Sequence, residues 1–186
     1  MKKKLIAAIS ALCIVGTAFV TAANTVNAEP AHREQKTEQT ASQDRIYNIA
    51  SVSKMYSALA VMQLAEHLKA NGCPKVVVND LARCDMAEAV EDAFRYGKLV
   101  LATTTYNNDV FPFMKTFIHH LTERNYQNRT VALIENGTWA PNAAKVMRGM
   151  LEGCKNLTVL EDVVTIRSAM NAESREAIAK LAQQLA

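Results

Sequence analysis

The chain has 186 residues, of which 49% are apolar and 21% charged, so it suits one domain with a hydrophobic core and not a disordered or fibrous chain. The formal net charge is +3, but Lys2, Lys3 and Lys4 lie in a segment that we expect to be removed. Without them, 18 basic residues balance 18 acidic ones. A neutral chain without a Lys/Arg-rich run has no charge that attracts nucleic acid, so we expect no nucleic-acid partner.

Residues 1–28 have the pattern of an export signal. Three lysines begin it, residues 5–23 are apolar apart from small hydroxyl residues, and Val26, Asn27 and Ala28 provide a compact cleavage point. The pattern predicts an exported protein, periplasmic or extracellular. The alternative is an uncleaved anchor, because the apolar run approaches the roughly 20 residues that cross a bilayer. This segment is the only membrane contact that we expect.

Residues 29–45 are rich in Glu, Gln, Lys, Thr and Ser, which is typical of a disordered linker. The remaining residues, 46–186, form the predicted domain. Its cysteines, Cys73, Cys84 and Cys154, lack the spacing of a zinc site or a disulfide framework and are interpreted as buried free thiols.

Short apolar runs alternate with helical patterns along this domain. The predicted strands are residues 45–50, 75–78, 99–103, 130–134 and a segment within 157–166. The predicted helices are residues 55–70, 85–96, 111–124, 141–153 and 172–185. Five apolar strands separated by helices predict an α/β fold with a parallel sheet covered on both faces.

Two loops that follow predicted strands are candidates for a ligand site, because ligands of such sheets bind at the carboxyl ends of the strands. Residues 103–112 read T-T-T-Y-N-N-D-V-F-P, and residues 135–141 read E-N-G-T-W-A-P. Their Thr and Asn side chains offer uncharged hydrogen bonds, and Tyr106 and Trp139 offer flat rings that can bracket a heterocycle such as flavin. The alternative is that both rings cap the end of the core.

From about residue 72 to the C-terminus, the chain resembles the flavodoxin-like domain of the flavodiiron proteins. The two loops carry the resemblance, together with A-E-A-V-E-D-A-F-R-Y-G-K-L-V-L-A and F-I-H-H-L-T-E-R-N-Y-Q-N-R. It implies a flavodoxin-like three-layer sandwich with a five-stranded parallel sheet, FMN as cofactor, electron transfer to an unidentified redox partner protein and a cytoplasmic origin. The residues implied at the flavin are Thr103, Thr104, Thr105, Tyr106, Asn107, Asn108, Asn136, Gly137, Thr138 and Trp139.

The first loop of the domain departs from this family. Flavodoxin-like domains hold the FMN phosphate in a Gly-containing Ser/Thr-rich turn between the first strand and the first helix. The counterpart here, A-S-V-S-K-M-Y-S, contains no Gly. The residues left to hold a phosphate are Ser51, Ser53, Lys54 and Ser57. In this arrangement residues 45–50 are the expected central strand, the weakest of the five because Asn48 interrupts it.

Residues 46–64 have a second resemblance, to the S-x-x-K segment of serine β-lactamases and penicillin-binding proteins. Three residues make about one helical turn, so Ser51 and Lys54 share a face and the Lys can take the Ser proton. The alternative function is therefore an exported serine hydrolase, although no K-T-G element follows. The two resemblances indicate a chimeric chain, and a third hypothesis is a relic that binds no ligand.

The sequence predicts no metal site. The H-x-H-x-D pattern that would complete a flavodiiron metal centre is absent, and His119 and His120 are neighbours on a predicted helix, where their side chains point about 100° apart. We interpret them as a surface pair. The acidic residues Asp80, Asp85, Glu88 and Glu91 are interpreted as a solvated helix start and face.

Overall fold

The computed structural model describes residues 5–9 and 52–186. Its elements are, in chain order, β1 (Leu5–Ile9), α1 (Val52–Ala70), β2 (Val76–Asp80), α2 (Met86–Arg95), β3 (Lys98–Tyr106), β4 (Asp109–Val110), α3 (Pro112–Glu123), β5 (Thr130–Asn136), α4 (Ala143–Leu151), β6 (Thr158–Val159), β7 (Val164–Ile166) and α5 (Ala172–Leu185). Every helix and strand predicted from residue 55 onward is present, with its ends shifted by a few residues.

The strands form one sheet in the order β2-β1-β3-β5-β6, in which all these neighbours are parallel. The fifth position is divided, because β6 pairs with the start of β5 and β7 pairs with its end. β4 is a two-residue strand that pairs antiparallel with β3. The α/β sandwich with five parallel strand positions is therefore confirmed, with the last predicted strand split in two.

The central strand is not the one that we expected. β1 lies between β2 and β3, with Ala7 opposite Val78 on one side and Val100 on the other. The prediction that residues 45–50 take this position is wrong, and residues 45–50 lie outside the described part of the chain. A central parallel strand is covered on both faces, which suits the uninterrupted apolar run L-I-A-A-I better than a run containing Asn48. These five residues belong to the expected export signal, for which the structure offers no support.

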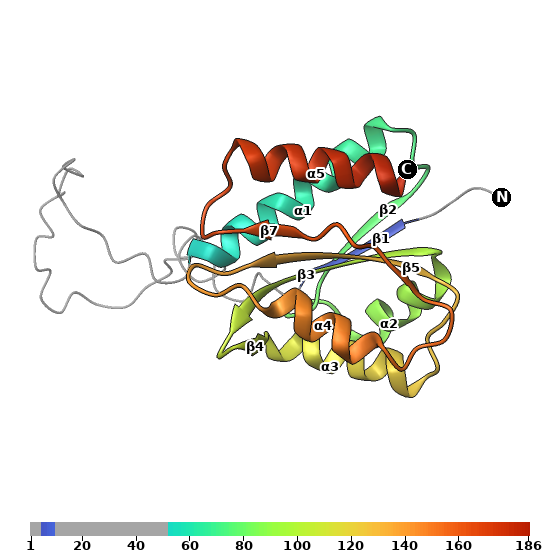
Figure 1. The fold of residues 1–186 in the computed structure, drawn as a ribbon. Helices are drawn as coiled ribbons and strands as arrows, with labels where there is room; N and C mark the ends of the chain where they lie inside the picture. The colour runs from blue at the N-terminus through green and yellow to red at the C-terminus, as the bar shows by residue number, and fades with distance from the viewer. Residues whose placement is uncertain (1–4, 10–51) are drawn as a thin grey trace, which may run out of the picture.

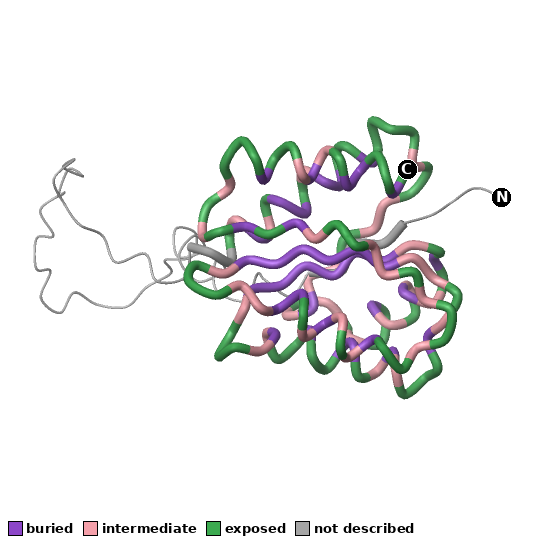
Figure 2. The backbone as a smooth tube through the Cα atoms, in the orientation of Figure 1, coloured by how far each residue is buried: buried purple, intermediate pink, exposed green. Residues whose placement is uncertain are grey.

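Two helical layers cover the sheet, α1 and α5 on one face and α2, α3 and α4 on the other (Figure 1). Successive residues of a strand point to opposite faces. Accordingly, Leu99 and Leu101 of β3 join a cluster with Phe117 of α3, whereas Val100 and Ala102 join a second cluster with helices α1 and α5. Figure 2 shows β3 and β5 buried along most of their length. Their ends carry the predicted flavin residues, so the candidate site rests on two strands that are buried along most of their length.

Local sequence signals set several helix starts. The carboxylate of Asp85 accepts a 2.7 Å hydrogen bond from the backbone N–H of Ala87 and caps α2. Asn171 caps α5 through the N–H of Ser174, at 2.8 Å, and Pro112 occupies the first turn of α3. Among the helices that the structure describes, none combines the length and apolarity needed to cross a membrane.

Tyr126 is buried under α2, with its ring edge-on to Phe94 at 5.2 Å between centroids. Within the described residues its hydroxyl has no hydrogen-bond partner. We expect Tyr126→Phe to raise the free energy of unfolding by about 1 kcal/mol in urea titrations, because it removes a polar group that is desolvated without compensation. Tyr106→Phe, at an exposed ring, is the control and should leave stability unchanged.

The pH dependence of the stability provides a second test of the Tyr126→Phe variant. Burial raises the pKa of Tyr126 well above its ordinary value of 10.0. Because the folded-state pKa exceeds the unfolded one, the unfolded chain loses this proton first, and stability falls as the pH rises above about 10. Tyr126→Phe should reduce this alkaline loss. An equal alkaline loss in both proteins would contradict the buried position of the hydroxyl.

Candidate functional site

The Tyr106 loop (residues 105–111) leaves the end of β3 as a tight hairpin. Asn107 and Asn108 connect β3 to β4 and have φ angles of 48° and 59°. A two-residue hairpin with both φ angles positive is a type I′ turn, for which Asn is among the best-suited residues. The turn leaves Tyr106 half-exposed, with its ring edge-on to Phe111 at 5.6 Å.

Asp109 stabilises the return side of this hairpin. Its carboxylate accepts hydrogen bonds from the Lys115 ammonium at 2.5 Å and from the backbone N–H of Val110 at 2.7 Å. The Lys115 bond, followed by the Val110 bond, lowers the pKa of Asp109 below its ordinary value. The hairpin is thereby attached to α3.

The Trp139 loop (residues 136–142) leaves the end of β5 and is attached to the segment that follows β7. The backbone N–H of Gly137 donates to the Ile166 carbonyl at 3.0 Å, and the side-chain oxygen of Asn136 accepts from the Ser168 N–H at 3.2 Å. The hydroxyls of Thr138 and Ser168 are 2.7 Å apart. Trp139 lies beyond these contacts with 95% of its surface exposed.

Hydrogen bonds join the two loops to each other. The Thr105 hydroxyl oxygen accepts from the backbone N–H of Asn142 at 3.0 Å and of Ala143 at 3.2 Å, at the start of α4. The Asn142 amide donates to the backbone and side-chain oxygens of Asn108, at 3.1 and 3.2 Å. The sequence analysis did not single out Asn142 or Ser168. An Asn directly before a helix, following Pro141, was the available signal for the first of them.

Glu135 is a second residue that the sequence analysis did not assign. Its carboxylate is buried and accepts from the backbone N–H of Ala144 and the hydroxyl of Thr165, both at 2.9 Å. It therefore connects β5 to the start of α4 and to β7. The available signal was a carboxylate in an otherwise apolar strand, since such groups are rarely buried without partners.

All ten residues implied at the flavin lie at the carboxyl ends of β3 and β5, which are neighbours, with Thr104 opposite Asn136. They divide by exposure into two groups. Thr103, Thr104 and Asn136 are buried, and Thr105 and Gly137 are half-buried. The exposed residues are Tyr106, Asn107, Asn108, Thr138 and Trp139. The first group supports the loops, and the second forms their solvent-exposed surface.

The residues predicted to hold a phosphate are only partly described. Ser51 lies outside the described residues, and Ser53 and Lys54 are placed in the first turn of α1 by their backbone alone. Ser57 has 1% of its surface exposed, which leaves almost none of it for a ligand. The phosphate contacts of Ser51, Ser53 and Lys54, and the hydrolase hypothesis based on Ser51 and Lys54, therefore stay predictions.

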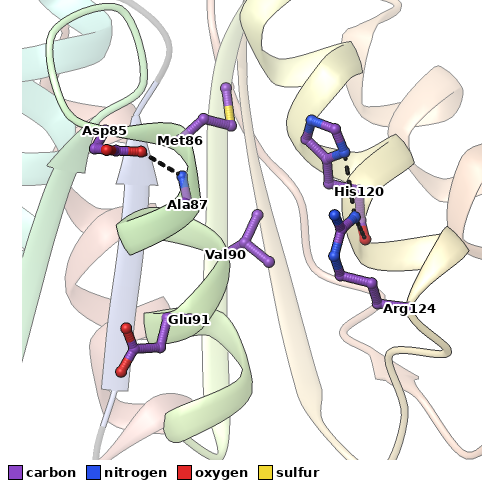
Figure 3. A pocket seen from close by; sticks show the side chains of 7 residues that line it. All are labelled: Asp85, Met86, Ala87, Val90, Glu91, His120 and Arg124. Atoms are coloured by element: carbon purple, nitrogen blue, oxygen red, sulfur yellow. Dashed lines mark hydrogen bonds between the residues drawn. The ribbon is translucent and has the colours of Figure 1, made fainter.

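A separate hollow of about 490 Å³ lies between α2 and α3. Figure 3 shows Val90 of α2 directed toward His120 and Arg124 of α3. His119 is exposed and His120 is half-buried at the hollow, so the pair lies at the surface and flank of α3. Both rings approach the Glu123 carboxylate, at 3.2 and 3.6 Å. Within residues 5–9 and 52–186, no group of three His, Cys, Asp or Glu side chains is placed to hold a metal ion. None of the predicted flavin residues lines this hollow.

No protein-family model matches the chain, and no curated protein matches it. Solved structures do. The rubredoxin oxygen:oxidoreductase of Desulfovibrio gigas matches with a TM-score of 0.65 and 18% identity, and the flavodiiron protein of Giardia intestinalis with 0.65 and 16%. Flavodoxin 1 of Bacillus cereus matches with a TM-score of 0.60 and 12% identity, over 88% of its length. Each match covers 70% of the present chain. The chain has the flavodoxin fold.

The flavodoxin-like sandwich implied by the sequence resemblance is thus confirmed. The chain spans about a third of the first two proteins, 32% in each case. In a flavodoxin fold the strand order reverses at β1, which has β2 on one side and β3 on the other. Open parallel sheets bind ligands at the carboxyl ends of the strands beside this reversal. The Tyr106 loop follows β3 directly and so lies beside this reversal, and the Trp139 loop follows β5, the next strand in the sheet.

Proposed function

We propose that this flavodoxin-fold domain binds FMN at the carboxyl end of its sheet and carries electrons. The observation that supports it is the exposure of two large rings, Tyr106 at 48% and Trp139 at 95%, on loops that are joined through Thr105 and Asn142. Aromatic rings so exposed are suited to stacking on a flat heterocycle. Bound FMN would supply the redox chemistry, because its ring system accepts and returns electrons.

The remaining loop residues would orient the ring. Asn107, Asn108 and Thr138 are exposed and offer uncharged donors and acceptors for the polar edge of a heterocycle. The buried members of the set, Thr103, Thr104 and Asn136, lie beneath the loops and would act by holding them. A preformed arrangement of this kind reduces the ordering cost of binding.

The phosphate would contribute little to affinity. The segment A-S-V-S-K-M-Y-S (residues 50–57), which was predicted to hold the phosphate, contains no Gly, and its Ser57 is buried. This segment therefore offers few groups to replace the usual cradle of backbone N–H donors. We therefore expect riboflavin, which has no phosphate, to bind nearly as tightly as FMN.

A titration that follows flavin fluorescence tests the proposal on the full chain. Trp139→Ala and Tyr106→Ala should each weaken FMN binding about fivefold or more, since stacking contributes on the order of 1 kcal/mol per ring. Trp139→Phe keeps a ring and should lose less. Val78→Ala, which shortens an exposed apolar side chain on β2, should leave the affinity unchanged.

Two outcomes would contradict parts of the proposal. Absence of binding for both flavins would leave the ligand-free relic as the better hypothesis. FMN binding tens of fold tighter than riboflavin would show that Ser51, Ser53 and Lys54 build a working phosphate site. Electron transfer has its own readout: the chain loaded with FMN, after gel filtration has removed unbound flavin, should be bleached by dithionite without oxygen and recover its absorbance when ferricyanide is added.

A further inference from the structure

Residues 5–9 have two incompatible descriptions. In the sequence they begin the apolar run that follows Lys2–Lys4, which is the pattern of an export signal. In the fold they are β1, and each of the five residues has a register partner in β2 and another in β3. The flavin proposal uses β1 only as a strand of the sheet and does not account for the export-signal pattern of the same residues.

Loss of β1 would remove the centre of the sheet. Within the described residues, β2 pairs with β1 alone, so without β1 it has no neighbour in the sheet. β3 would keep its pairing with β5 and expose its other side to solvent. Unpaired backbone groups in a covered sheet carry a desolvation cost, and the apolar faces of β2 and β3 would be separated. A chain that begins at Glu29 therefore cannot form the sheet seen here.

We propose that residues 5–9 are a retained strand of the folded domain, and that folding and export compete for them. A chain that has folded around β1 has these residues paired on both sides and cannot present them as an extended signal. A chain cleaved after Ala28 has lost the strand. The same residues therefore determine whether this chain becomes a folded domain or an exported, incomplete one.

Substitution with proline tests the strand. Proline removes a backbone donor, and inside a central strand that donor belongs to a ladder. We expect Ala7→Pro to lower the folding equilibrium constant about a hundredfold or more in urea titrations of the uncleaved chain. Ala172→Pro is the matched control, because Ala172 is exposed at the first position of α5, where a proline is tolerated, and it should leave the urea midpoint unchanged.

Hydrogen exchange followed by mass spectrometry tests, without a mutation, whether residues 5–9 are part of the folded sheet. In the folded full chain, amides of residues 5–9 should exchange as slowly as those of β3. Fast exchange of residues 5–9 in a chain whose β3 is protected would overturn the proposal. So would a protein of residues 29–186 that unfolds with the midpoint of the full chain. Neither readout involves flavin, so failure here is distinguishable from failure of the proposed function.

The competition between folding and export can be tested separately by producing the protein in a bacterial host that exports proteins. Leu101→Ala removes a fully buried side chain of β3 and weakens the fold while leaving residues 1–28 intact. Intact-mass measurement should show at least a severalfold larger fraction of chains cleaved after Ala28 in this variant than in the unchanged protein. Replacing Lys2, Lys3 and Lys4 with Glu should suppress cleavage and keep the urea midpoint. An unchanged cleaved fraction in Leu101→Ala would exclude competition.

Discussion

Gly137→Ala is expected to lower the free energy of unfolding by about 1–3 kcal/mol and to weaken flavin binding. A Cβ at residue 137 would lie 2.9 Å from the Pro141 Cα and 3.2 Å from the Pro141 nitrogen. These are backbone atoms of a residue that cannot rotate away, so the Trp139 loop between the two positions must shift. The hydrogen bond from the Gly137 N–H to Ile166 would be disturbed with it.

Gly149→Ala is the matched control and should act in the opposite direction. Gly149 lies in α4, with no heavy atom within 4 Å of an added Cβ. Alanine in a helix is favoured over glycine by roughly 0.5–1 kcal/mol, so this variant should be slightly stabilised. Urea unfolding and FMN titration of both variants check the pair. Equal effects at the two positions would show that the Trp139 loop does not depend on the close approach of Gly137 to Pro141.

Thr105→Val should separate the two loops. The substitution keeps the shape of the side chain and removes the oxygen that accepts from the Asn142 and Ala143 N–H groups. Two part-buried donors then lose their acceptor, which we expect to cost about 1–3 kcal/mol of stability. Because the same hydroxyl joins the Tyr106 loop to the start of α4, flavin affinity should fall even though Thr105 is not among the exposed loop residues.

The serine variant distinguishes a lost hydrogen bond from a packing change. Thr105→Ser keeps the hydroxyl and should retain most of the stability and of the flavin affinity, whereas Thr105→Val should lose both. Calorimetric melting and fluorescence titration measure the two quantities on the same samples. If Val and Ser behave alike, the contacts of the Thr105 oxygen do not hold the loops together.

The helices and most of the strands of this domain, β3 and β5 among them, could be predicted because their signals are local. The helix over residues 172–185 was predicted with the ends that it has, and Asp85 and Pro112 mark helix starts by their own chemistry. That the Tyr106 loop and the Trp139 loop lie at the same end of the sheet could be predicted from position, since loops after parallel strands meet at one end of a sheet. These signals do not predict which loop residues face solvent and which are buried.

The residues that connect the site had weaker signals, because their roles depend on partners distant in the sequence. Asn142 has only the weak signal of an Asn before a helix, and Ser168 has no such signal. The two residues act through Asn108 and Asn136. Glu135 is buried because Ala144 and Thr165 both donate to it. The sequence predicted Ser57 as a phosphate ligand, but the packing of α1 buries this residue.

The sequence by itself determined the alternation of helices and strands, since periodicity, capping and turn chemistry act between residues close in the chain. This alternation predicted the parallel α/β sandwich, and the family resemblance implied its flavodoxin-like form. Only the tertiary structure decided which segment is the central strand. Residues 5–9 and residues 45–50 are both short runs with apolar side chains, and local propensity does not rank them against partners far away in the chain. Pairing with β2 and β3 on both sides selects the run that can be covered on both faces, because a polar side chain there would be desolvated.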